Sequence, residues 1–546
     1  MKMINIFKTF VMLMGIVVFQ SSCKKLDLAP KDRFSELNFW QVDANVNNAL
    51  NNVYNSIYTS TNVFYNEAMS DNAVSKLDVN TGANTIGNGN FTIDLARFRN
   101  DWAFYYSGIK SCNLFLENID KNNTLPMATK NRMLGEVRFV RAWHHFNLMK
   151  WWGAVPLLNK DITPEQAQIV ARNPKADVLA FILSELDAAA AALPTKDQYT
   201  PADNGRITKG AALALKARVL LYEGNRMAEV ATVCEALINN QSANGNYSLA
   251  ASYSDLFSDK TLNKTNNESI LSLQYVPNLR MWGDYFDFAP ISEGARTNNL
   301  SPTQELVDSY IMLNGKAIND AGSGYTDSAL SVNRDPRLAA TIVYDKYLWT
   351  KPNGTSVTIY IKPGSTIAPA PNSNEFSTSG QGTATGYYWR KYWDPNYVGT
   401  LNNGTNIHLI RYAEVLLMYA EAKQTLGQLD ATVWDKTIKI LRTRAGFTEA
   451  TALNFPGTLN LQNIVRNERR SELAMEGFRI DDIRRWNIAQ IVLNAWMHGA
   501  KYGDVGVDNG FIRAQFRNFD PTKNFLWPIP PSERALNPNL TQNPNY

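Results

Sequence analysis

Closely spaced carboxylates near the C-terminus are the residues best placed to do chemistry. The run Asn467–Glu476 reads NERRSELAME, which puts Glu468, Glu472 and Glu476 at i, i+4 and i+8 of a predicted helix. Glycoside hydrolysis needs two carboxyl groups that face each other across a cleft. Carboxylates on one helical face, interleaved with arginines, instead favour ion pairs within the fold. We therefore predict a structural ion-pair lattice here.

The other chemically active residues lack the spacing that catalysis or metal binding requires. Asp481-Asp482 adjoins Arg484-Arg485 and is again interpreted as ion-paired. His144-His145 is the only histidine pair, and adjacent residues of a helix point about 100° apart, so the two rings cannot hold one metal ion. No H-E-x-x-H, G-x-S-x-G, P-loop or G-x-G-x-x-G motif is present. The sequence predicts no catalytic residue, no metal site and no cofactor, and we expect no enzyme.

Apolar residues at helical spacing predict that most of the chain is α-helical. The strongest helix is expected over 133–152, where Gly153 and Pro156 stop it. Cys112 and Cys234 lie in helix-like apolar patterns without a metal-ligand partner, so both are predicted to be buried free thiols. Further helices are predicted at 39–60, 101–119 (with Asp101 as its N-cap), 175–193, 207–223, 226–240, 408–426, 433–445 and 461–477.

Two of the predicted helical regions share one pattern of small residues. Leu213, Ala217, Gly224 and Ala228 have the same offsets as Leu416, Ala420, Gly427 and Ala431. Small residues at these offsets let two antiparallel helices approach closely, as in tetratricopeptide helix pairs. A long segment separates the two copies, so the chain is no uninterrupted repeat array.

The segment 245–405 differs in texture from the helical parts. It contains Asn-Gly turns and clusters of Pro, Gly, Ser and Thr, and its 363–386 stretch has no periodicity. A strand is predicted at Val357–Ile361, and aromatic residues are frequent. We interpret the segment as a loop-rich subdomain inserted into a helical scaffold. Long loops in compact proteins are usually functional.

The N-terminus has the pattern of an export signal. Lys2 and Lys8 come before an apolar run, Thr9–Phe19. The run is followed by Gln20, Ser21, Ser22 and Cys23. The run is shorter than the roughly 20 residues that span a bilayer. A cysteine directly after small residues resembles a bacterial lipoprotein signal, in which the thiol of Cys23 is diacylated and begins the mature chain. Two acyl chains anchor a protein stably, so a tethered domain is expected.

Composition excludes several classes of protein. The 54 Lys and Arg against 50 Asp and Glu give a net charge of +4, without the basic excess of a nucleic-acid-binding protein. A hydrophobic content of 45% excludes a disordered chain. Three cysteines are too few for a disulfide framework. The charged fraction is a modest 19%, which suits an uncharged polar partner.

Several segments, in order along the chain, carry a family resemblance. They are Phe39-Trp40, FVRAWHHFNLMKWWGAVP at Phe139–Pro156, RDPRL at Arg334–Leu338, RYAEVLLMYAE at Arg411–Glu421, NERRSELAMEGFRIDDIRRW at Asn467–Trp486, and LWPIP at Leu526–Pro530 followed by QNPNY at Gln542–Tyr546. Together they resemble the SusD/RagB family of surface nutrient-binding lipoproteins. The resemblance covers the whole mature chain.

This resemblance implies about four tetratricopeptide-like helix pairs with an irregular, loop-rich subdomain inserted. The expected parts are a lipoprotein signal peptide (1–22), an N-terminal helical region (23–244), an inserted subdomain on the ligand side (245–405), and a C-terminal helical region with a closing segment (406–546). It also implies an outer-membrane location, lipid-anchored and facing the cell exterior, and a SusC-like TonB-dependent barrel transporter as partner. The expected function is capture of an oligosaccharide and its delivery to that transporter.

In relatives, a loop after the first helices and the inserted subdomain supply the ligand contacts. By resemblance, these correspond to Ser70–Arg99 and Met281–Phe288 in this chain. Aromatic rings cover the C–H faces of sugars, and polar side chains reach their hydroxyls. The expected ligand-binding residues are Asp71, Asn72, Phe91, Arg97, Trp282 and Tyr285. Trp282, beside Gly283-Asp284, is the best candidate for a stacking platform, with packing in the core as the alternative.

Two other functions remain open at this point. The RagB branch of the same family captures peptides, and a screen with glycans and oligopeptides would separate the two ligand classes. A helical-repeat scaffold of the outer membrane that binds only proteins is the third reading. An exposed aromatic platform in the insert would count against such a scaffold.

Overall fold

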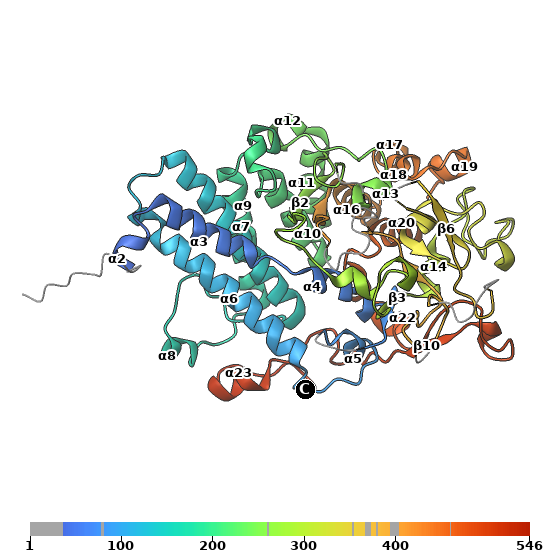
Figure 1. Ribbon diagram of the computed structural model, residues 1–546. Helices are drawn as coiled ribbons and strands as arrows, with labels where there is room; N and C mark the ends of the chain where they lie inside the picture. Colours follow the sequence, from blue (N-terminus) through green and yellow to red (C-terminus); the bar gives the residue numbers. More distant parts are fainter. Residues whose placement is uncertain are drawn as a thin grey trace, which may run out of the picture.

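Helices dominate the structure, a computed structural model that describes residues 36–77, 81–258, 261–351, 354–365, 373–377, 380–393, 403–458 and 460–546. This confirms the predicted mostly α-helical class (Figure 1). The predicted signal peptide and Cys23 lie outside the described residues. Within the described part, no helix is both long enough and apolar enough to cross a membrane.

Four long helices pack side by side in the N-terminal part of the chain (Figure 1). They are α3 (Asp43–Asn55), α6 (Ala96–Asn118), α7 (Met127–Trp152) and α9 (Lys175–Ala192). Helix α7 contacts both α6 and α9. Because it has neighbours on two sides, it buries residues nearly all round, including His144 and His145.

Two of these helices begin earlier than their apolar pattern predicts. Helix α6 starts at Ala96, so Asp101 is not its N-cap; the carboxylate instead accepts a 2.7 Å hydrogen bond from Arg97 one turn earlier. Helix α7 starts at Met127, directly after Pro126. The added turns, ARFRN and MATKNR, hold mainly polar and charged residues, so the apolar period there is too weak to detect.

Both copies of the small-residue pattern form packed helix pairs, as predicted. Helix α10 (Lys209–Glu223) packs on α11 (Met227–Asn239), and α16 (Tyr412–Thr425) packs on α17 (Ala431–Lys436) and α18 (Ile438–Ala445). Gly224 and Gly427 follow α10 and α16 with φ of 75° and 69°. No heavy atom lies within 4 Å of a Cβ built on either residue, so their left-handed backbone, and not crowding, requires glycine. Helix α11 also packs on α16.

The strands of the described residues pair in twos, antiparallel, away from the four long helices (Figure 1). The predicted strand at Val357–Ile361 is observed as β6. The pairs are β1 (Ala73–Ser75) with β3 (Leu300–Pro302), β2 (Ser269–Leu273) with β8 (Ile407–Arg411), β4 (Ile342–Val343) with β7 (Tyr388–Trp389), β5 (Tyr347–Thr350) with β6 (Ser356–Ile359), and β9 (Trp496–His498) with β10 (Arg513–Phe516).

Shorter helices connect these elements. They are α2 (Glu36–Phe39), α4 (Ser60–Tyr65), α5 (Ala83–Gly87), α8 (Pro164–Ala167), α12 (Gln241–Asn244), α13 (Tyr253–Ser258), α14 (Gln304–Ser309), α15 (Arg337–Thr341), α19 (Ala450–Leu453), α20 (Leu461–Leu473), α21 (Arg479–Arg485), α22 (Ala489–Val492) and α23 (Pro531–Leu536).

Most aromatic residues of the segment 245–405 build its core. Trp349, Trp389, Trp393, Tyr388 and Tyr392 are each at most 1% exposed. Trp349 and Trp393 meet edge to face, with ring centroids 5.0 Å apart. A segment with little regular structure gains its packing from such large rings, because its short strands bury little surface by themselves.

The predicted ion-pair lattice is present, with one correction to its geometry. Helix α20 ends at Leu473, and Met475 has a left-handed φ of 64°, so Glu476 is on a turn and not on the same helix as Glu468 and Glu472. All three carboxylates are nevertheless buried and ion-paired. The nearby pairs Asp481–Arg484 and Asp482–Arg485 also form.

The lattice joins the segment 245–405 to the C-terminal helices. Glu472 contacts Arg337 of α15 at 2.9 Å, Arg411 of β8 at 2.6 Å, and Arg444 of α18. Glu476 pairs with Lys391 at 2.7 Å and with Arg411 at 2.8 Å. Burial alone would raise the pKa of Glu472, but the three guanidiniums hold it well below its usual range.

Candidate ligand-binding site

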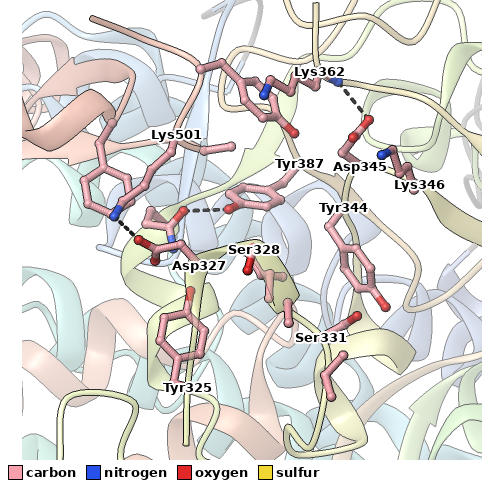
Figure 2. A pocket seen from close by; sticks show the side chains of 17 residues that line it. Tyr325, Asp327, Ser328, Ser331, Tyr344, Asp345, Lys346, Lys362, Tyr387 and Lys501 are labelled. Atoms are coloured by element: carbon pink, nitrogen blue, oxygen red, sulfur yellow. Dashed lines mark hydrogen bonds and ion pairs between the residues drawn. The ribbon is translucent and has the colours of Figure 1, made fainter. Parts of the chain in front are cut away.

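A cavity of about 490 Å³ lies where the segment 304–387 meets the C-terminal loop 500–511. Its wall consists of residues 327–332, 344–346 and 500–502, together with Gln304, Tyr325, Lys362, Tyr387 and Phe511. Figure 2 shows Tyr325, Tyr344 and Tyr387 around Asp327 and Ser328. Aromatic surface and hydroxyl groups therefore face the same space.

The aromatic wall combines one buried ring with several that are partly exposed. Tyr387 is 1% exposed, whereas Tyr325, Tyr344, Tyr502 and Phe511 are half-buried. Burial raises the pKa of Tyr325 to about 12, so its hydroxyl is neutral and can both donate and accept a hydrogen bond. Half-buried rings with neutral hydroxyls are suited to the C–H faces and hydroxyls of a sugar.

Rigid elements hold this wall in place. The hydroxyl of Tyr387 donates to Gln304 Oε1 at 2.6 Å, and Gln304 is the first residue of α14, which the side chain of Thr303 caps. Gly386 precedes Tyr387 with a φ of 82°. A Cβ on Gly386 would come within 2.7 Å of the Tyr502 ring, so both the backbone and the close approach require glycine there.

The two carboxylates of the cavity, Asp327 and Asp345, have different partners: an ion pair in one case and backbone N–H groups in the other. Lys501 Nζ and Asp327 Oδ2 form an ion pair at 2.5 Å across the rim. Asp345 Oδ1 accepts hydrogen bonds from the backbone N–H groups of Ile361 and Lys362, at 2.8 and 3.0 Å. Both carboxylates are committed to partners in the protein, and neither faces the other as an acid and base pair would. The arrangement is suited to binding a ligand.

A histidine between two carboxylates supports the loop that carries Lys501 and Tyr502. His498 of β9 contacts Glu305 of α14 through Nδ1 at 2.7 Å and Asp508 through Nε2 at 3.2 Å. Arg513 of β10 also contacts Asp508, at 2.6 Å. Hydrogen bonding to Glu305 raises the pKa of His498, which favours the doubly donating imidazolium.

Three of the residues predicted to bind ligand are buried and paired within the protein. Asp71 contacts Arg479 at 2.7 Å and Arg470 at 3.0 Å. Asn72 donates to Glu67 at 2.9 Å. Arg97 contacts Asp101 at 2.7 Å and donates to the Thr81 carbonyl and the Asn66 side chain. These polar groups hold the segment after α4 against α21 and α6. Their contact with a ligand stays a prediction.

Trp282 occupies the core, which corrects the expectation of an exposed stacking platform. It is 4% exposed, and its indole N–H donates to the Thr405 carbonyl at 2.7 Å. Its ring packs against Phe64 and Phe288, with centroids 5.0 and 6.3 Å apart. A sugar cannot reach a ring whose neighbours already cover it. The alternative of core packing, stated above for Trp282, holds here.

Of the other two predicted aromatic contacts, Phe91 does not line the cavity. Phe91 is half-buried and meets Phe98 edge to face, with centroids 5.3 Å apart. Tyr285 lies in the short turn Asp284–Asp287, and its side chain is outside the described residues. Hydroxyls of Ser60 and Thr61 bond Asp284 and hold this turn against α4.

The structure also settles the status of the histidine pair and the free thiols. His144 and His145 are fully buried, and burial lowers the pKa of both rings to about 3 and about 4. Among the described residues, no group of His, Cys, Asp and Glu is arranged to hold a metal ion. Cys112 and Cys234 are buried and unpaired, as predicted.

The cavity wall contains the sequence pattern of an aromatic residue beside Gly and polar residues, the pattern that led to the prediction of Trp282. Tyr325 stands in GYTDS and Tyr502 in GAKYG, where a ring is flanked by Gly, Asp, Lys or Ser. The same rule selected Trp282 in MWGDY. Sequence alone does not show that 500–511 folds against 325–346, because these segments meet only through long-range packing.

An α-helical scaffold of paired helices that carries a loop-built, tyrosine-lined cavity is typical of a binding protein. The family model described as the SusD family matches residues 236–546. A second model, described as starch-binding and associating with the outer membrane, matches residues 26–221. The chain therefore belongs to the SusD family of carbohydrate-binding proteins, as its motifs predicted.

Individual relatives are similar to this chain over nearly its whole length. A SusD-like protein, P38, of Formosa agariphila is 25% identical over 563 residues, which cover 99% of each chain. A solved SusD-like carbohydrate-binding protein from Bacteroides fragilis is 30% identical, with a TM-score of 0.82 over 92% of this chain and 100% of that one. Another SusD-like protein from Bacteroides fragilis is 28% identical, with a TM-score of 0.78 over 95% of this chain and 100% of that one.

Proposed function

We propose that this chain captures oligosaccharides in the tyrosine-lined cavity and passes them intact to a SusC-like TonB-dependent transporter. The cavity carries this proposal: half-buried rings, neutral hydroxyls and charged groups face one space and are fixed by α14 and the turn at Gly386. The solved relative described as a carbohydrate-binding protein supports the ligand class. The transporter partnership rests on the resemblance to the SusD/RagB family.

The proposed location is the outer surface of the outer membrane, with lipid on Cys23. The short apolar run before Ser21-Ser22 and Cys23 supports export and acylation. The family description of association with the outer membrane supports the same location. Two or more acyl chains would hold the protein at the surface while the cavity stays in water.

Calorimetric titration with a panel of oligosaccharides and oligopeptides tests the ligand class. We expect an oligosaccharide to bind and to be recovered uncleaved. Tyr325→Ala should weaken that binding by about 2 kcal/mol, or roughly thirtyfold, because it removes a half-buried ring of the wall. Tyr325→Phe keeps the ring and is the control; its smaller loss measures the hydroxyl alone.

Three outcomes would contradict the proposal. Equal affinity of Tyr325→Ala and the unchanged protein would place the ligand outside this cavity. Binding of oligopeptides without any oligosaccharide would favour the peptide-capturing reading of the family. Sustained release of cleaved sugar would show an enzyme, against the commitment of Asp327 and Asp345 to partners in the protein.

A further inference from the structure

Lys346 has a backbone conformation that lysine rarely adopts. It lies in the turn from Tyr344 to Tyr347, which a 3.0 Å hydrogen bond from Tyr347 N–H to the Tyr344 carbonyl closes, and its φ is 63°. Glycine and asparagine enter this left-handed region most readily. The turn is pinned by a 2.8 Å bond from Lys346 N–H to the Ile359 carbonyl. A strained residue that lines a cavity points to a use for its side chain.

The lysines of the cavity outnumber the acids available to them. Lys346, Lys362 and Lys501 line it, against Asp327 and Asp345 (Figure 2). Asp327 is taken by Lys501. The carboxylate of Asp345 is turned to the backbone at Ile361 and Lys362 and to the Ser365 hydroxyl. Within the described part of the chain, the amines of Lys346 and Lys362 form no ion pair, and both residues are exposed.

A buried guanidinium adds positive charge behind the same wall. Arg334 is 4% exposed and lies 5.1 Å from the centroid of the Tyr325 ring. Its hydrogen bonds run to the backbone carbonyls of Val307, Tyr310 and Leu330. Carbonyl dipoles solvate the guanidinium but do not neutralise it, and the low dielectric behind Tyr325 screens its charge poorly. The acids Asp308 and Asp335 also act on Arg334 and offset part of its charge. Lys346 and Lys362 are therefore the groups that bring positive charge to the cavity rim without an ion-pair partner among the described residues.

We propose that the oligosaccharide held in this cavity carries anionic substituents, carboxylates or sulfate esters, which Lys346 and Lys362 contact. This inference rests on the proposed function and adds the chemical class of the sugar. The rings of Tyr325 and Tyr502 cover C–H faces, while the two amines reach anionic groups at the rim. The proposal departs from the uncharged partner that the overall composition suggests, because composition averages over surfaces that never meet the ligand.

The test compares three hexasaccharides by calorimetric titration at low salt: a neutral maltohexaose, a galacturonate hexamer and a sulfated galactan hexamer. We expect an anionic hexamer to bind more tightly than the neutral one and to weaken as salt is raised. The double variant Lys346→Asn/Lys362→Gln should lose about tenfold in affinity for that hexamer and little for the neutral one. The two anionic probes distinguish carboxylate from sulfate.

Lys346→Asn carries its own control for folding. Asparagine tolerates a φ of 63° better than lysine, so this variant should melt at the same or a higher temperature while it binds the anionic hexamer less well. Lys346→Arg should bind the anionic hexamer as the unchanged protein does, because it keeps the charge. Lys121→Asn removes an exposed lysine of a distant turn and should leave affinity unchanged.

The outcomes separate this inference from the proposed function. Tight binding of maltohexaose that is lost in Tyr325→Ala, but is unaffected by the lysine variants, would overturn the anionic ligand and keep sugar capture. Equal affinity for neutral and anionic hexamers would overturn it as well. Failure of every oligosaccharide to bind would overturn both.

Discussion

Charged side chains are arranged in opposite ways around Glu472 and around the tyrosine-lined cavity. Around Glu472, acids and bases are buried and matched in ion pairs. The single side chain of Arg411 contacts three glutamates, Glu268, Glu472 and Glu476. Around the cavity, the lysines are exposed and exceed the acids available to them. The first region fixes the position of the segment 245–405 on the C-terminal helices. The second leaves charge free to meet something from outside.

The difference shows which parts of the sequence report on function. The run NERRSELAME, which is the most recognisable motif of the chain, forms the buried lattice. Its residues identify the fold because the fold requires them. The cavity wall comes from GYTDS, YDKY and GAKYG, short segments without a family motif. A motif can thus identify the scaffold while the ligand surface varies.

The largest expected effect is on the matched region. Glu472→Ala should lower the free energy of unfolding by about 5 kcal/mol, because it leaves several buried guanidiniums short of a partner. Chemical denaturation measures the loss, and the folded fraction should bind sugar as before. Asp327→Asn is the control for stability: it breaks an exposed ion pair and should change unfolding by less than about 1 kcal/mol. Unchanged stability with lost binding would move Glu472 into a ligand site.

A slightly smaller effect is expected at Trp282. Trp282→Ala should destabilise the fold by about 4 kcal/mol, because it empties a site packed by Phe64 and Phe288 and frees the Thr405 carbonyl. Trp282→Phe keeps most of the volume and should cost less. Thermal melts and titration of both variants measure the two effects. An unshifted melt together with lost sugar binding would restore Trp282 as a stacking platform and weaken the contrast between the regions.

Local patterns were enough to predict the scaffold. Apolar spacing located α9, α10 and α11 to within two residues, and the repeated small residues identified two helix pairs. Such elements are determined by neighbours along the chain. The pattern missed the first turns of α6 and α7, where apolar residues are few, and it extended α20 through the turn at Met475. There, long-range ion pairs of Glu476 override the local preference.

The candidate site was harder to predict because it depends on contacts between distant segments. The pattern of a ring beside Gly and Asp occurs at Trp282 and at Tyr325 alike, yet one is buried and the other half-buried. Only the packing of Phe64 on Trp282, and of loop 500–511 beside Tyr325, distinguishes them. The left-handed φ of Lys346 leaves no trace in the sequence, since lysine is not a residue that marks such turns.

The smallest expected effect concerns His498, which lies between the two kinds of region. It is partly exposed. Glu305 of α14 and Asp508 of the loop between β9 and β10 face it, and Arg513 of β10 contacts Asp508. Its pKa is raised above 6.5 in the folded protein. The stabilisation is therefore complete below about pH 6.5 and is lost as the pH rises through the folded pKa. Because the side chains are partly in water, we expect a shift of only a few degrees in melting temperature between pH 6 and pH 8.

His498→Gln should remove this pH dependence, and NMR titration of the ring measures the pKa directly. A pKa at or below 6.5, or a pH dependence that persists in His498→Gln, would show that the two carboxylates do not hold an imidazolium and that loop 500–511 is supported by packing alone.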